Sequence, residues 1–151
     1  MTEKIKRILL VDDDQILNFL HSRLFEKTGI VEQVDIALNG REALDYLAKG
    51  INKREAEQET DIQPEIILLD INMPVMDGWE FLEEYKKLGN TNRHGIMVVM
   101  LTSSLNPDDR EKAKQYEEIT TFINKPLSIP MIQEIFSKYL DVEATYNIQD
   151  E

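Results

Sequence analysis

The sequence predicts an α/β fold in which a parallel sheet of five strands is covered by helices on both faces. Short apolar runs at residues 8–11, 66–69 and 96–101 are each bounded by polar turn residues, which is typical of strands buried on both faces. Strands and segments with apolar residues at helical spacing alternate five times. With 151 residues, 42% of them hydrophobic, the chain can form one domain with a sizeable core.

The first half of the chain supplies two strand–helix units. The first apolar run ends at three aspartates, of which Asp14 is expected to cap a helix that ends at Gly29. A weaker, partly exposed strand is expected over residues 31–38, and a short helix over residues 41–49. Residues 50–64 are polar and highly charged, so we expect a mobile surface loop there that could extend the preceding helix.

The second half begins with the apolar run that ends at Asp70. Asp77 is expected to cap the next helix, and Gly78 to ease the turn before it. A strand at residues 96–101 leads to a helix that opens with Asn-Pro-Asp-Asp at 106–109, a sequence that combines a cap, a first-turn proline and acids near the helix N-terminus. Residues 120–124 are expected to form the fifth strand.

The last helix is expected to begin after Ser128, which would cap it. An apolar stripe follows on this helix, formed by Met131, Ile135 and Tyr139. The stripe is more apolar than a surface helix requires, so a homodimer that buries it is one expectation. We interpret residues 1–140 as one domain, with a frayed acidic tail at 141–151 and no output domain.

The composition excludes several classes of function. A net charge of −12 and a pI near 4.6 oppose contact with phosphate backbones and anionic lipids, so direct nucleic-acid or membrane binding is not expected. The chain has no cysteine, which excludes disulfides and thiol catalysis. No apolar run is long enough for a signal peptide or a membrane span, so a cytoplasmic protein is predicted.

Polar side chains follow four of the expected strands. Asp12 and Asp13 follow the first strand, Asp70 the third, Thr102 the fourth and Lys125 the fifth. Because the carboxyl ends of parallel strands meet at one edge of the sheet, we expect these side chains to lie together. Clustered carboxylates repel one another unless a cation intervenes, and magnesium suits a site with few carboxylates, some waters and phosphate oxygens.

Magnesium is expected to be bound directly by Asp13 and Asp70, with Asp12 binding directly or through water and the backbone carbonyl of Asn72 adding another oxygen. Asp70 would then act as a nucleophile that accepts a phosphoryl group as an acyl phosphate. Magnesium, the lysine ammonium and the threonine hydroxyl would each hold one phosphoryl oxygen. No histidine or arginine follows a strand, so a slowly decaying, signalling state is expected.

Four short motifs carry a resemblance to a known family. They are Asp12–Asp13, the sequence Asp-Ile-Asn-Met-Pro-Val-Met-Asp-Gly at 70–78, Thr102–Ser103 and Lys125–Pro126. Together they resemble the receiver domain of two-component response regulators, over roughly residues 5–140. The resemblance implies a flavodoxin-like (CheY-like) three-layer sandwich, with a five-stranded parallel sheet of order 2-1-3-4-5 and five helices.

The resemblance also implies roles for individual residues. Asp70 would be the phosphoacceptor, and a sensor histidine kinase or phosphotransfer protein would supply the phosphoryl group with Mg²⁺ as cofactor. Thr102, Ser103 and Lys125 would bind the phosphoryl group, and Phe122 would be the switch aromatic that packs inward. The peptide before Pro126 would be cis. The output would be a protein contact through a remodelled face of the fourth helix, fifth strand and fifth helix.

Two other functions remain open. A phosphatase of the haloacid dehalogenase type would use the Asp-x-Asp pattern at 12–14, but it leaves the motif at 70–78 unexplained. A receiver-like interaction scaffold that never carries phosphate is the second, although the intact acids, threonine and lysine argue against it. His21 and His94 are predicted to be surface residues without a chemical role.

Overall fold

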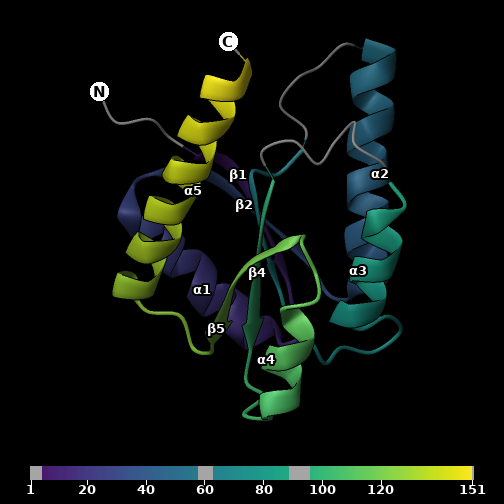
Figure 1. Ribbon diagram of the computed structural model, residues 1–151, viewed down its shortest axis with the longest axis vertical. Helices are drawn as coiled ribbons and strands as arrows, with labels where there is room; N and C mark the ends of the chain where they lie inside the picture. The colour runs from purple at the N-terminus through teal and green to yellow at the C-terminus, as the bar shows by residue number, and fades with distance from the viewer. Residues whose placement is uncertain (1–4, 58–62, 89–95, 151) are drawn as a thin grey trace.

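The computed structural model describes the backbone of residues 5–57, 63–88 and 96–150 and contains the expected parallel sheet. Its five strands lie in the order β2-β1-β3-β4-β5, and each neighbouring pair is parallel (Figure 1). The elements are β1 (Ile5–Val11), α1 (Gln15–Thr28), β2 (Val31–Ala37), α2 (Gly40–Glu57), β3 (Ile66–Leu69), α3 (Gly78–Lys86), β4 (Met97–Thr102), α4 (Pro107–Ala113), β5 (Ile119–Asn124) and α5 (Ile129–Asp150). This order confirms the flavodoxin-like fold.

Helices cover both faces of the sheet, with α1 and α5 on one face and α2 and α3 on the other (Figure 1). Successive side chains of a strand point to opposite faces. In β1, Ile8 and Leu10 therefore pack with the α1–α5 side, and Leu9 and Val11 pack with the α2–α3 side. β3 and β4 are buried along their whole length, and β1 is buried over its last four residues, as the apolar runs at these positions predict.

Short polar residues fix the helix ends as predicted. The Asp14 carboxylate accepts a hydrogen bond from the Leu17 N–H at 3.0 Å, and Gly29 ends α1 with a φ of 69°. Asp77 and Glu80 form a reciprocal capping box at the start of α3. The Asp14 cap places the first turn of α1 close after β1, and the Asp77 cap starts α3 after the loop that follows β3.

Position 78 requires glycine for a stronger structural reason than the turn before α3. The Gly78 N–H donates to the carbonyl of Ile71 at 2.8 Å, and a Cβ at this position would lie 2.3 Å from the backbone oxygen of Asp70. A backbone oxygen cannot move aside as a flexible side chain can, so only glycine allows α3 to begin against the Asp70 peptide. The close contact holds the residue after β3 in place.

The first half of the expected loop at residues 50–64 instead continues α2 to Glu57, which is the extension of the preceding helix that the sequence left open. Residues 58–62 lie outside the described part of the chain. Residues 53–57 consist of lysine, arginine, glutamate and alanine, which have high helix propensity. Once the first turns of α2 are packed against the sheet, each further residue of this kind extends the helix at little cost.

The tail that was expected to be frayed continues α5 to Asp150. No glycine or proline follows Pro130 up to that residue, so no residue type in the tail breaks the helix. Neither α5 nor any other helix in the described part of the chain is long and apolar enough to cross a membrane.

The apolar stripe of α5 faces the core of its own chain. Ile135 and Tyr139 are buried, and Met131 packs against the same cluster, which includes Phe25 of α1. The argument for a homodimer through an exposed stripe is therefore wrong, and dimerisation stays a prediction without that support.

Candidate functional site

The pairing of β1 with β3 brings two aspartates side by side. Val11 lies opposite Leu69 in this ladder, and each is followed directly by an aspartate, Asp12 or Asp70. The Asp70 N–H donates to the Val11 carbonyl at 2.9 Å, so the ladder continues past the strand. Both carboxylates therefore start from neighbouring backbone positions at one edge of the sheet, as expected.

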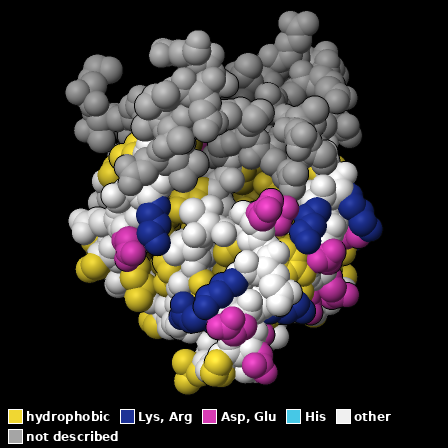
Figure 2. All heavy atoms as spheres, viewed as in Figure 1, with side chains coloured by type: hydrophobic (Ala, Val, Ile, Leu, Met, Phe, Trp, Pro, Cys, Tyr) yellow, Lys and Arg dark blue, Asp and Glu magenta, His cyan; other side chains and the backbone are white. Residues whose placement is uncertain are grey.

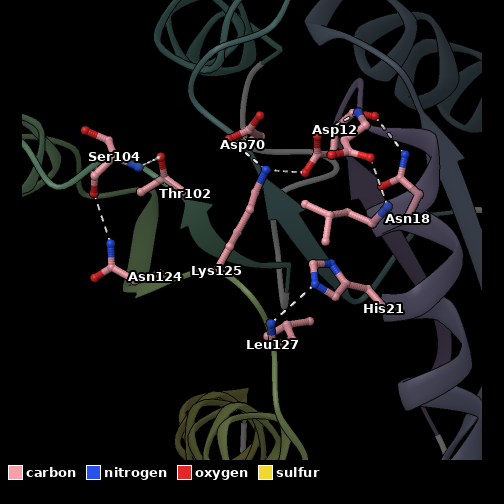
Figure 3. Close-up of polar contacts among 11 residues, drawn as sticks. Asp12, Asn18, His21, Asp70, Thr102, Ser104, Asn124, Lys125 and Leu127 are labelled. Carbon is pink, nitrogen blue, oxygen red and sulfur yellow. Dashed lines mark hydrogen bonds and ion pairs between the residues drawn. The ribbon is translucent and has the colours of Figure 1, made fainter.

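The pairing of β4 with β5 brings a hydroxyl and an ammonium to the same edge. Thr102 lies opposite Asn124, and the N–H of Lys125 donates to the Thr102 carbonyl at 2.8 Å. From there the Lys125 side chain reaches toward Asp12 and Asp70 (Figure 3). The peptide between Lys125 and Pro126 is cis, as the resemblance implied.

The ammonium of Lys125 lies between two buried carboxylates (Figure 3). Its Nζ is 2.5 Å from Oδ2 of Asp12 and 3.4 Å from Oδ1 of Asp70, and no side chain of the three is more than 8% exposed. Buried charges are unfavourable unless they are paired. The pairing offsets part of the cost of holding two carboxylates together in the protein interior.

Three carboxylates at this edge fit a divalent cation. Asp12, Asp13 and Asp70 can each place one oxygen so that the three atoms lie within 4.8 Å of one another. With a single ammonium beside them, two negative charges remain uncompensated. Asp13 is exposed, so the group has a side open to water, and hard oxygen ligands with room for water suit magnesium. Asn72, in the loop before α3, would offer its backbone carbonyl.

The acids and the lysine shift each other's proton affinity. Burial raises the pKa of Asp70 from 3.8 to about 6, the Asp12 carboxylate adds to the rise, and Lys125 opposes it. Burial alone would lower the pKa of Lys125, but its hydrogen bond to Asp12 and the charges of both carboxylates outweigh burial and raise it. At neutral pH Lys125 is therefore a cation and Asp70 is mostly ionised.

Two buried residues of α1 support the site and were not found from the sequence. The side-chain amide of Asn18 donates to the Asp12 carbonyl at 2.8 Å, and Nε2 of His21 accepts from the Leu127 N–H at 3.3 Å (Figure 3). The prediction that His21 lies at the surface is wrong, since it is 2% exposed. Asn18, His21 and Phe25 are spaced three and four residues apart, which places them on one face of α1. This spacing could have indicated from the sequence that the two polar residues are buried with Phe25. His94 lies outside the described residues.

The remaining predicted residues lie around the ion cluster. Thr102 is fully buried, and its hydroxyl oxygen accepts a hydrogen bond from the N–H of Ser104 at 3.0 Å. Ser103 is exposed beside it. Phe122 is half-buried in β5, and the guanidinium carbon of Arg110 lies 4.7 Å from the centre of its ring.

A family model described as the response regulator receiver domain matches residues 8–137. The chain belongs to this family. Sporulation initiation phosphotransferase F of Bacillus subtilis (strain 168) is 30% identical to this receiver over 139 residues, which cover 92% of this chain and 97% of that protein. The probable methanogenesis regulatory protein FilR2 of Methanothrix harundinacea (strain 6Ac) is 34% identical over 121 residues, 80% of this chain and 72% of the relative.

Solved structures agree with the assignment. A two-component response regulator from Cytophaga hutchinsonii aligns with a TM-score of 0.76 and 32% sequence identity, covering 92% of this receiver and 99% of that chain. The alignment covers almost all of both chains, so the two proteins share the same overall fold.

Replacing Asp70 by asparagine is expected to stabilise the receiver at pH 7 when divalent cations are removed. The pKa of Asp70 is higher in the folded chain, so stability falls as pH rises from about 4 to about 6, and this group adds no further change above that. The difference between 3.8 and about 6 corresponds to ~3 kcal/mol, so Asp70→Asn should gain about 1–3 kcal/mol.

Urea unfolding in EDTA at pH 4 and pH 7 measures this effect. The difference between Asp70→Asn and the wild type should vanish at pH 4. Asp14→Asn is the matched control, because asparagine keeps the helix cap and Asp14 is exposed. An Asp70→Asn variant that is no more stable than wild type at pH 7 would contradict the proposed burial cost.

Proposed function

We propose that this receiver accepts a phosphoryl group on Asp70 from a phosphorylated histidine of a sensor kinase or phosphotransfer protein, with Mg²⁺ as cofactor. The observation that carries the proposal is the Lys125 ammonium 3.4 Å from the Asp70 carboxylate, beside two further carboxylates that suit a divalent cation. An ionised acid flanked by fixed cationic groups is what phosphoryl transfer to a carboxylate requires.

The transfer needs no separate base. An oxygen of the Asp70 carboxylate attacks phosphorus while the phosphorus–nitrogen bond to histidine breaks, and the electron pair stays on the imidazole nitrogen. Because the pKa of Asp70 is about 6, the attacking carboxylate is mostly ionised at neutral pH. Magnesium, when bound, neutralises charge on the phosphoryl oxygens.

Lys125 and Thr102 would hold the transferred group. The ammonium that pairs with Asp12 and Asp70 would turn to one phosphoryl oxygen, and the buried Thr102 hydroxyl would donate to another. The exposed Ser103 would face the group from the solvent side. In this proposal Phe122 then packs inward and remodels the face formed by α4, β5 and α5, which binds a downstream protein.

The start of α1 offers a docking surface for the phosphodonor. Ile16, Phe19 and Leu20 are 74%, 58% and 50% exposed on the helix that begins directly after the aspartates. Exposed apolar side chains grouped on one helix are typical of a protein contact. We call these three residues the α1 patch, and we propose that a helix of the donor packs on it.

The phosphatase alternative has no support in the geometry of Asp12. Its Oδ2 pairs with Lys125, and its Oδ1 accepts a hydrogen bond from the Asp14 N–H at 2.9 Å. A nucleophilic carboxylate with both oxygens engaged in this way is poorly placed for attack. Asp70, by contrast, contacts Lys125 through Oδ1 at 3.4 Å, a longer distance than the 2.5 Å between Asp12 and Lys125.

Acetyl phosphate with Mg²⁺ tests the proposed acceptor. Wild type should gain one phosphoryl group by intact-protein mass spectrometry, Asp12→Asn less of it, and Asp70→Asn none. Asp14→Asn, which removes a neighbouring acid outside the cluster, should react as wild type does. Multiple turnovers by Asp70→Asn would favour the phosphatase, and a wild type that accepts phosphate from no donor would favour the scaffold.

Ile16→Ser is expected to slow phosphotransfer from a phosphorylated histidine protein by about ten- to a hundredfold, because a buried isoleucine contributes roughly 1.5–3 kcal/mol to a contact. Its reaction with acetyl phosphate should be unchanged, since a small donor needs no docking surface. Leu140→Ser on α5, which is also exposed, is the control for loss of an apolar surface residue. Equal rates for both variants with the protein donor would contradict docking on the α1 patch.

A further inference from the structure

A chain of contacts links Thr102 to Phe122 through helix α4. The Ser104 N–H donates to the Thr102 hydroxyl oxygen at 3.0 Å, and the Asn124 side-chain amide donates to the Ser104 carbonyl at 3.0 Å (Figure 3). Arg110 donates from Nη2 to the Asn124 side-chain oxygen at 3.2 Å, and its guanidinium carbon lies 4.7 Å from the centre of the Phe122 ring. Thr102, which binds the phosphoryl group in the proposed function, is thus connected to Phe122, the proposed switch aromatic.

The same series of contacts is also hydrogen-bonded to the first turn of α4. The Ser104 hydroxyl donates to Oδ2 of Asp109 at 2.5 Å and accepts from the Asn106 N–H at 3.2 Å. Asn106 also caps α4. Ser104 therefore contacts the end of β4, the start of α4 and, through Asn124, β5. If the loop between β4 and α4 shifts, these hydrogen bonds must break, or their partners must move with the loop.

We propose that Arg110 is a latch that holds Phe122 and the loop between β4 and α4 in the observed arrangement, and so opposes the phosphorylated state. The proposal rests on the proposed function, in which Thr102 and Phe122 move when Asp70 is phosphorylated. Phenylalanine has no hydroxyl with which to form a hydrogen bond, so a cation over the ring is the polar contact that can hold it.

Arginine suits this role because its planar guanidinium can lie over a ring and donate from its edge at the same time. Lysine carries the same charge on a single tetrahedral nitrogen. It is therefore less suited to contact the Phe122 ring and donate to Asn124 at the same time. Arg110 is exposed, so its replacement should leave the core intact.

Lys112 is the matched control on the same helix. Its Nζ lies 4.8 Å from the centre of the Trp79 ring, so it makes the same type of contact with a different aromatic residue. Trp79 in turn stacks on Tyr116, with ring centres 5.5 Å apart, and neither residue belongs to the series of contacts from Thr102 to Phe122 described above. Lys112→Gln removes one positive charge and one cation–π contact from α4 and leaves the Arg110 latch in place.

The affinity for beryllofluoride with Mg²⁺, a phosphoryl mimic, measures the latch. Arg110→Gln should bind beryllofluoride about two- to fivefold more tightly than wild type, the effect of losing one exposed cation–π contact from the free state. Lys112→Gln should bind with wild-type affinity or more weakly, and Arg110→Lys should lie between wild type and Arg110→Gln. A purely structural role would lower thermal stability without tightening this binding.

An Arg110→Gln variant that binds beryllofluoride no more tightly than Lys112→Gln would overturn the latch. If wild type fails to bind beryllofluoride at all, the proposed function fails, and the latch is then tested in the free protein by NMR. There the Phe122 ring signals should shift in Arg110→Gln and not in Lys112→Gln. Unchanged ring signals in Arg110→Gln would overturn the latch independently of phosphorylation.

Discussion

The contact on which the rest of the site depends is the ammonium of Lys125 between the buried carboxylates of Asp12 and Asp70. Without a cation, two acids on neighbouring strands could not both stay ionised in a buried position. One ammonium compensates only part of the charge, and the exposed Asp13 adds more. The lysine therefore holds the acids together but leaves excess negative charge, which a divalent cation would neutralise.

The features that sequence reasoning predicts well are local or follow from sheet geometry. Apolar runs of four to six residues mark the central strands, and Asp14, Asp77 and Ser128 lie at helix starts as their side chains favour. Because all strands are parallel, the residues after them must share an edge. The meeting of Asp70 with Lys125, 55 positions further along the chain, could therefore be predicted without any knowledge of side-chain packing.

The features that sequence reasoning misses depend on packing between elements. His21 and Asn18 are polar, and only the docking of α1 on the sheet decides that they are buried and support the site. The apolar stripe of α5 is needed for the core because α5 packs on the same face of the sheet as α1. The contact of Arg110 with Phe122 joins a helix to a strand across a loop, and no spacing rule along the chain marks it.

Binding of Mn²⁺, a paramagnetic substitute for Mg²⁺ with the same preference for oxygen ligands, tests the central claim most directly. Followed by NMR, Mn²⁺ should broaden the amide signals near Asp12, Asp13, Asp70 and Asn72 first, and Asp13→Asn or Asp70→Asn should abolish this selective broadening. Broadening that spreads over the many acids of this chain, or that persists in both variants, would contradict a metal site formed at the ends of β1 and β3.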